Sequence, residues 1–423
     1  MSSTVIRIKR QIRDPLYRNS LFLMASTVVT TSLGFFFWMV VARFYTEAEV
    51  GLASAIISAV YLLALFSTLG VDVALIRFLS KAERPVEMIN SCFTLSGIVA
   101  LALAGIFIAG LDLWSPALGF IREDAMFILS FVFFAFGWTL SGIMGSIFIA
   151  KRRADFTLTK STIFSLLKIP LPILLVLFFR AFGIVSSWGI AIGVALAISL
   201  FLFLPRVQNR YRPVPKIDLG IMKDIWRYSA GNYFAALFAA ASTFILPIMI
   251  VNLLGAEQNA YFYVAWMMAG LLFAIPGAVS QSLFAEGSHL EDQLGVNVRR
   301  SFRFIFLLLI PAIILLLLVG KWLLLLFGES YSENALTLLR ILVLSGIFVG
   351  VNSVYYTILR VGGRIRELVA LSGFITLAVL VVSYFITPAT GIIGVGYAWI
   401  GAQGLIAMYV TLAIGPRYIK ERL

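Results

Sequence analysis

Residues 304–324 read FIFLLLIPAIILLLLVGKWLL, and this stretch decides what kind of fold the chain can adopt. Lys321 is its one charged residue, and a basic cluster at Arg299, Arg300 and Arg303 precedes it. A helix of about 20 apolar residues crosses the hydrocarbon core of a bilayer and satisfies its own backbone hydrogen bonds there. The stretch therefore predicts a membrane-spanning helix.

Similar stretches recur along the whole chain. Of its 423 residues, 61% are hydrophobic and 13% are charged, whereas a soluble domain carries about 25% charged residues. The sequence thus predicts an all-α integral membrane protein with twelve transmembrane helices. The expected spans are residues 19–43, 51–76, 88–111, 125–150, 159–180, 183–204, 228–253, 260–285, 304–324, 335–359, 366–387 and 391–414.

Basic residues alternate between the two sides of these spans. Of the 33 Lys and Arg residues, 27 fall in the two termini and in the loops after spans 2, 4, 6, 8 and 10, Lys160 among them. The opposite loops hold four, namely Arg43, Arg122, Arg180 and Lys321. Because loops rich in Lys and Arg stay in the cytoplasm, we expect a multi-pass protein of the cytoplasmic membrane with both termini cytoplasmic. This bias accounts for the net charge of +13, so nucleic acid is not an expected partner.

The two halves of the chain repeat each other when 209 is added to the residue number. Residues 17–20 then fall on 226–229, residues 46–49 on 255–258, and residues 149–151 on 358–360. We therefore expect an N-terminal six-helix lobe at 1–204, a cytoplasmic linker at 205–225 and a C-terminal six-helix lobe at 226–423. Six is even, so the repeats are parallel, related by a pseudo-two-fold axis along the membrane normal.

Three shared features carry a family resemblance. Each half opens with Arg-x-Ser, at Arg18 and at Arg227, an acidic turn follows spans 1 and 7, and a basic loop follows spans 4 and 10. In these the chain resembles the polysaccharide transporter family, within the flippase superfamily that also holds the multidrug and toxin extrusion (MATE) antiporters and the lipid II flippase. The last has two further helices, so twelve spans favour the O-antigen or repeat-unit flippase type. The resemblance implies a MATE-like fold of two V-shaped lobes.

The resemblance also implies a function. A flippase of this kind translocates a polyprenyl- or dolichyl-(pyro)phosphate-linked oligosaccharide across the cytoplasmic membrane by alternating access, without hydrolysis. Expected partners are that lipid-linked oligosaccharide, membrane lipids and enzymes of polysaccharide assembly, and we expect a monomer. Two alternatives stay open: a MATE-like drug or cation antiporter, which needs a carboxylate for ion coupling, and a membrane-embedded polysaccharide polymerase or ligase, which should carry a sizeable outer loop.

Ionisable residues inside the spans are the first candidates for the site, because each costs about 2.5–3.5 kcal/mol to insert and usually faces a cavity or a partner. Lys168 lies near the middle of span 5, and we interpret it as a cavity-lining cation, with pairing to another helix as the alternative. Asp72 lies inside the end of span 2, close to Arg77. It is a candidate for proton or sodium coupling, although neutralising that arginine would explain it equally well.

A pyrophosphate path should offer arginines, whose planar forks bind phosphate oxygens in pairs. Arg18 and Arg227 lie at matching ends of spans 1 and 7, Arg43 lies at the other end of span 1, and Arg340 lies in the outer part of span 10. Anchoring at the membrane surface is the simpler explanation for each. The amides that could bind sugar hydroxyls, or bond helix to helix, are Asn252, Gln281, Asn352 and Gln403.

Catalytic signatures are missing from the sequence. It contains no GxxxxGK[ST], HExxH or GxSxG pattern and no paired metal-ligand motif, so we expect no enzyme, no catalytic residue, no metal and no cofactor. A proton or sodium gradient, or the flux of the substrate itself, should drive transport. The single cysteine, Cys92, is expected to be a small core residue.

Overall fold

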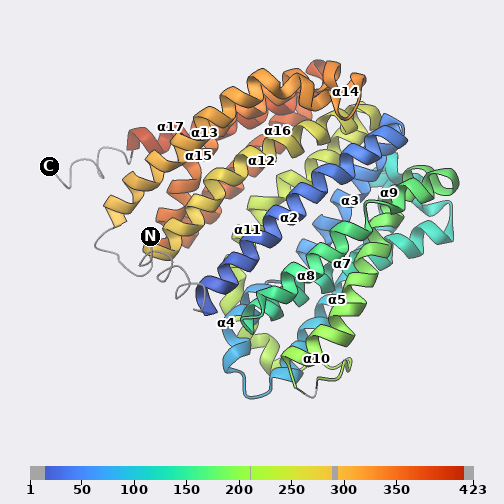
Figure 1. Ribbon diagram of the computed structural model, residues 1–423, viewed down its shortest axis with the longest axis vertical. Coiled ribbons are helices and arrows are strands. Elements are labelled where there is room, and N and C mark those ends of the chain that lie inside the picture. Colours follow the sequence, from blue (N-terminus) through green and yellow to red (C-terminus); the bar gives the residue numbers. More distant parts are fainter. Residues whose placement is uncertain (1–14, 210, 288–293, 414–423) are drawn as a thin grey trace, which may run out of the picture. The chain divides into compact units, whose positions relative to one another are not determined.

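The computed structural model describes residues 15–209, 211–287 and 294–413 (Figure 1). Every regular element in these ranges is helical, and twelve stretches are long and apolar enough to cross a membrane. The predicted fold class and the predicted number of spans are therefore confirmed. The elements are α2 (Pro15–Phe44), α3 (Glu47–Ser67), α4 (Val71–Phe78), η1 (Leu79–Lys81), α5 (Pro85–Ala109), α6 (Leu111–Trp114), η2 (Pro116–Arg122), α7 (Ala125–Ala150), α8 (Ala154–Leu167), α9 (Leu171–Ile198), η3 (Ser199–Phe203), α10 (Leu204–Val207), α11 (Leu219–Leu254), α12 (Ala256–Gly287), α13 (Leu294–Leu325), α14 (Glu329–Asn334), α15 (Leu336–Val361), α16 (Ile365–Thr390) and α17 (Ile393–Ala413).

The chain packs into two compact units. The first comprises residues 1–45 and 56–233, and the second comprises residues 46–55 and 234–423. Residues 46–55, at the start of α3, belong to the second unit because Gly51 meets α12 there: an added Cβ at Gly51 would lie 1.7 Å from the backbone oxygen of Ala256. Asn259 Nδ2 also donates to the Gly51 carbonyl at 2.8 Å. Only a glycine permits so close an approach of two helices.

The second span ends earlier than the sequence predicts. The expected range 51–76 treats residues 68–70 as helical, whereas α3 stops at Ser67 and α4 starts at Val71. Leu69 and Gly70 both have positive φ angles, of 48° and 76°, and such a left-handed pair interrupts a helix. Asp72 thus lies in the first turn of the short helix α4, beyond the span Glu47–Ser67.

The fifth span is also interrupted, directly after Lys168. Helix α8 ends at Leu167, and α9 begins at Leu171 behind Pro170. Proline lacks the backbone N–H that a continuous helix needs as a hydrogen-bond donor, and its ring clashes with the preceding turn. The fifth span, Ala154–Val176, therefore joins α8 to the start of α9, and the sixth, Ala181–Val207, contains the rest of α9 with η3 and α10.

The helix ends after spans 4 and 10 have the same geometry, at an offset of 211 residues rather than the 209 of the sequence repeat. The Arg153 N–H donates to the Phe148 carbonyl at 2.8 Å, five residues back, and the Arg364 N–H donates to the Leu359 carbonyl in the same way at the same distance. Each turn has a left-handed residue just before that donor, Arg152 with φ 55° in the first half and Gly363 with φ 67° in the second. These are matching Schellman caps.

The segment between the two halves has no regular secondary structure from residue 211 to residue 218 and is held to α5. Asn90 Nδ2 donates to the Arg212 carbonyl at 3.0 Å, and the N–H groups of Lys216 and Asp218 donate to Thr94 Oγ1 at 3.2 Å and Ser91 Oγ at 2.9 Å. We call residues 211–218 the strap. Its first residue, Tyr211, belongs to the hydrophobic core that α4, α5 and α7 share, and burial raises the pKa of Tyr211 to about 12.

Candidate functional site

Lys168 lies in a box of aromatic rings inside the first unit. Its Nζ is 5.1 Å from the ring centroid of Phe37, 4.8 Å from that of Phe164 and 4.4 Å from that of Trp188. Among the described residues no carboxylate is within ion-pair distance of this ammonium group. Cation–π attraction to desolvated rings, worth about 2 kcal/mol each at best, offsets much of the cost of insertion.

The side chain of Lys168 is 2% exposed, so the rings that stabilise it also cover it. Trp188 packs on Trp138 with 5.7 Å between their centroids, and Trp138 packs on Tyr61 at 4.5 Å. These rings come from α2, α3, α7, α8 and α9, so five elements meet around one lysine. A ligand can reach the ammonium group only after the covering side chains or their helices have moved.

A second buried lysine, Lys160, lies eight residues earlier on α8. The sequence predicts a position in the basic loop after span 4, and the structure corrects this. Lys160 is 8% exposed, and its Nζ donates to Oγ of Ser141 at 3.0 Å and, over a shorter distance, to the carbonyl oxygen of the same residue. The helix starts earlier than expected, at Ala154 rather than 159. The spacing of the two lysines was a usable signal: Lys160 and Lys168 are eight residues apart, and residues i and i+8 lie on about the same face of a helix.

Acidic residues are confined to the ends of the spans. Among the described residues of the twelve spans, each carboxylate lies in the first three positions of its span, and the lysines at 160 and 168 are buried in the interior. Those acidic residues are Glu47, Glu49, Glu87, Asp155, Glu257 and Glu367. The buried charge of the described spans is therefore positive, and it is concentrated in α8 and at its end.

Asp72 lies where the break between α3 and α4 meets α11. An added Cβ at Gly70 would lie 2.9 Å from Ser229 Cβ and 3.0 Å from Tyr233 Cβ, and the Tyr233 hydroxyl donates to the Phe66 carbonyl at 3.0 Å. Burial raises the pKa of the Asp72 carboxyl, and hydrogen bonds to the backbone lower it by less. The Ser229 hydroxyl beside this break is buried and has no hydrogen-bond partner. Proton or sodium coupling at Asp72 stays a prediction.

Two of the four predicted arginines have described side chains, and both of these are exposed. Arg43 is exposed in the last turn of α2, and Arg340 is exposed near the start of α15. Arg18 and Arg227 belong to α2 and α11, but their side chains lie outside the described residues. Next to Arg18, Asn19 Oδ1 accepts from the Ala154 N–H at 3.1 Å, which fixes this end of α2 against the start of α8.

The predicted amides lie in the second unit and mostly bond within it. Asn352 is 2% exposed, and its Nδ2 donates to the carbonyl of Gln403 at 3.0 Å and to its Oε1 at 2.7 Å, so α15 and α17 are joined. Asn252 Nδ2 donates to the Ile248 carbonyl at 2.6 Å within α11. Gln281 is exposed on α12. Among these, Asn352 and Gln403 are brought together as a helix-to-helix contact, and their sugar binding stays a prediction.

A family model described as "Polysaccharide biosynthesis protein" matches residues 40–336. This match spans more than half of the chain. The chain belongs to the polysaccharide transporter family. A curated relative from Shigella flexneri, named a putative O-antigen transporter, is 24% identical over 177 residues, which are 40% of this chain and 42% of that protein. The chain thus matches less than half the length of that relative.

Solved structures confirm the family's fold for this transporter. An inward-facing multidrug resistance MATE family transporter of the MOP superfamily superposes with a TM-score of 0.70 at 18% identity, covering 95% of this chain and 98% of the other. The lipid II flippase MurJ in an inward closed conformation gives 0.74 at 15% identity, covering 93% and 87%. At these identities the likeness concerns the fold alone, so the cargo has to be argued from this chain's own residues.

Proposed function

We propose that this transporter flips an anionic lipid-linked oligosaccharide, a polyprenyl or dolichyl (pyro)phosphate glycan, from the cytoplasmic to the outer leaflet by alternating access. One observation carries the choice of cargo. The described spans bury two lysines in their interior and keep every carboxylate within the first three positions of a span. A positive interior attracts a phosphorylated headgroup and repels a cationic drug.

Membership of the polysaccharide transporter family supports the same proposal, as does the similarity to a protein named a putative O-antigen transporter. Lys168, with Arg18, Arg43, Arg227 and Arg340, would contact the phosphates, while Asn252, Gln281 and Asn352 would bind sugar hydroxyls. Asp72 would couple the cycle to a proton or sodium gradient. The drug antiporter and the polymerase or ligase remain rivals. The carboxylate of Asp72 would suit an antiporter, but it lies outside the described spans.

Reconstitution tests the proposal directly. The full chain is placed in vesicles that carry a fluorescent undecaprenyl-pyrophosphate sugar in both leaflets, and a membrane-impermeant quencher reports the fraction in the outer leaflet. In protein-containing vesicles the fluorescent lipid that is first protected in the inner leaflet should become accessible to the quencher with time. In protein-free vesicles it should stay protected. A neutral fluorescent glycolipid and a cationic dye serve as competing cargoes in the same assay. Transport of the dye without transport of the pyrophosphate lipid would establish the antiporter instead.

A further inference from the structure

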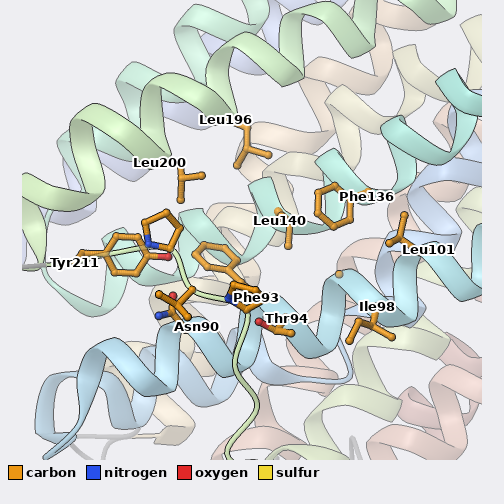
Figure 2. A pocket seen from close by; sticks show the side chains of 14 residues that line it. Asn90, Phe93, Thr94, Ile98, Leu101, Phe136, Leu140, Leu196, Leu200 and Tyr211 are labelled. Carbon is orange, nitrogen blue, oxygen red and sulfur yellow. The ribbon is translucent and has the colours of Figure 1, made fainter.

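A cavity of about 310 Å³ opens within the first unit, beneath the strap (Figure 2). Three helical segments form its walls: α5, the middle of α7, and the end of α9 with η3. Figure 2 shows Leu196 and Leu200 on one side and Asn90, Phe93, Thr94 and Ile98 on the other. The lining residues are Asn90, Phe93, Thr94, Gly97, Ile98, Leu101, Phe136, Leu140, Leu196, Leu200, Tyr211, Pro213, Val214 and Pro215. We call this the strap groove.

The chemistry of the lining indicates an apolar occupant. Three lining side chains carry a polar group, and two of these, Asn90 and Thr94, already bond to the strap. The remaining walls offer aromatic and aliphatic carbon. A sugar or a bound water would find few free partners there, whereas a hydrocarbon chain needs none.

The dimensions fit a single acyl chain. From Asn90 to Leu101 the groove follows α5 for roughly 16 Å at 1.5 Å per residue, close to the roughly 15 Å that one leaflet contributes to the hydrocarbon core. Its Asn90 end lies near the basic loops, and Ile98 and Leu101 are 53% and 45% exposed. A π-helical segment, η3, carries Leu200 into the wall, and such distortions often mark functional positions.

Charge at the strap favours a lipid with one phosphate. Arg84 is 3.1 Å from Glu87 and 3.4 Å from Asp218, and Lys216 is 3.5 Å from Glu87, so these two cations are balanced by two carboxylates. Arg212 is exposed and forms no ion pair with a described residue. Its carbonyl accepts a hydrogen bond from Asn90 in the groove wall, so among the described residues Arg212 is a cation beside the groove without an ion pair.

We propose that the strap groove binds one acyl chain of an anionic phospholipid from the leaflet on the basic side, with Arg212 contacting its phosphate. The lipid would fill the space between the strap and α5, α7 and α9, and so stabilise the connection between the two halves. The cargo proposed above has at least two phosphate charges when it carries a pyrophosphate, and a prenyl chain far longer than one leaflet. This site therefore does not rest on the proposed function.

Photolabelling of the full chain in vesicles tests the proposal. The vesicles contain phosphatidylcholine with a small fraction of phosphatidylglycerol that carries a diazirine on one acyl chain, and the labelled peptides are identified by mass spectrometry. Labelling should be enriched at residues 93–101, 136–140 and 196–200. Leu101→Trp should reduce it at least severalfold by filling the groove. Ile106→Trp, on the same helix and 56% exposed but outside the groove, should leave it unchanged.

Headgroup variants test the charge. Arg212→Gln should weaken labelling by phosphatidylglycerol about fivefold relative to an equivalent phosphatidylcholine probe, whereas Arg206→Gln, on α10 outside the groove, should not. Three results would overturn the proposal. They are labelling spread evenly over the lipid-facing helices, equal labelling by the two headgroups in the wild type, and displacement of the label by undecaprenyl phosphate but not by unlabelled phosphatidylglycerol.

Discussion

Lys168 combines a charge with an apolar environment, and the two can be separated by a single substitution. Methionine has a similar length and packs well on aromatic rings through its sulfur, so Lys168→Met should keep the box of Phe37, Phe164 and Trp188 filled. Because a buried charge is costly, we expect an unchanged or higher melting temperature. If the lysine contacts the phosphates during transport, flipping of the pyrophosphate lipid should fall at least tenfold.

The same chemical change at an exposed site provides the control. Lys321→Met, near the end of α13 and exposed, should leave both the melting temperature and the flipping rate near their wild-type values. Lys168→Arg separates charge from size, since it keeps the cation but has to fit a larger group into a closed box. Full transport by Lys168→Met would show that the lysine only fills space among the rings.

Asp72 should make stability depend on pH. Burial raises its pKa above the ordinary 3.8, so the folded state binds a proton more tightly than the unfolded state does. The resulting stability is complete below pH 3.8 and is lost as pH rises through the raised pKa of the folded state, by up to about 1.4 kcal/mol per pH unit in that window. The melting temperature of the wild type should therefore fall there as pH rises, and Asp72→Asn should remove that part of the fall. Identical profiles for the two proteins would contradict the prediction.

At the scale of elements, the cap after α7 contains a strain that the second half avoids. Arg152 adopts φ 55°, where the backbone of a residue with a Cβ is strained, and Gly363 holds the matching position after α15. The left-handed conformation costs a residue with a Cβ roughly 1–2 kcal/mol, and glycine avoids that cost but loses more backbone entropy on folding. Arg152→Gly should therefore raise the free energy of unfolding by about 1 kcal/mol, seen as a higher melting temperature in detergent. Arg152→Ala, which removes the charge and keeps the strain, should change little, and Gly363→Ala should be destabilising. A fully charge-driven effect would instead make the two Arg152 variants alike.

Sequence patterns predicted the elements well where hydropathy decides them and poorly where backbone geometry does. The run at 304–324 lies within α13, as expected. The predicted end of the second span was wrong because Leu69 and Gly70 are compatible with an apolar span. Only their left-handed φ angles reveal the break between α3 and α4. The buried position of Lys160 was missed for a similar reason: a lysine close to a basic cluster looks like a loop residue until the start of α8 is known.

The candidate site was harder to predict than the fold because contacts between distant residues decide it. Lys168 was found from its position within an apolar span, but its partners Phe37 and Trp188 come from helices far away in sequence. The pairing of Asn352 with Gln403 likewise depends on how α15 and α17 pack. No periodicity encodes the strap groove, whose walls join α5 to residues more than 100 positions later.

For the whole molecule, the distribution of basic loops predicts which side of the membrane each connection faces. Glu123, after η2, and Asn209, after α10, are both exposed, and three predicted spans separate their loops, so they should lie on opposite sides. Cys92 is fully buried, as predicted, so Cys92→Ala gives a cysteine-free background with little rearrangement. In that background a membrane-impermeant maleimide should label Glu123→Cys in intact cells.

Asn209→Cys should react with the same maleimide only after the membrane is permeabilised, because basic loops are retained in the cytoplasm. Labelling of both cysteines under denaturing conditions controls for expression. The opposite pattern would invert the molecule, and the strap with Arg212 would then face the outer leaflet. A cargo synthesised in the cytoplasm would then have to enter at the other end of the helices, so the direction of transport relative to the protein would be the reverse of the one proposed here.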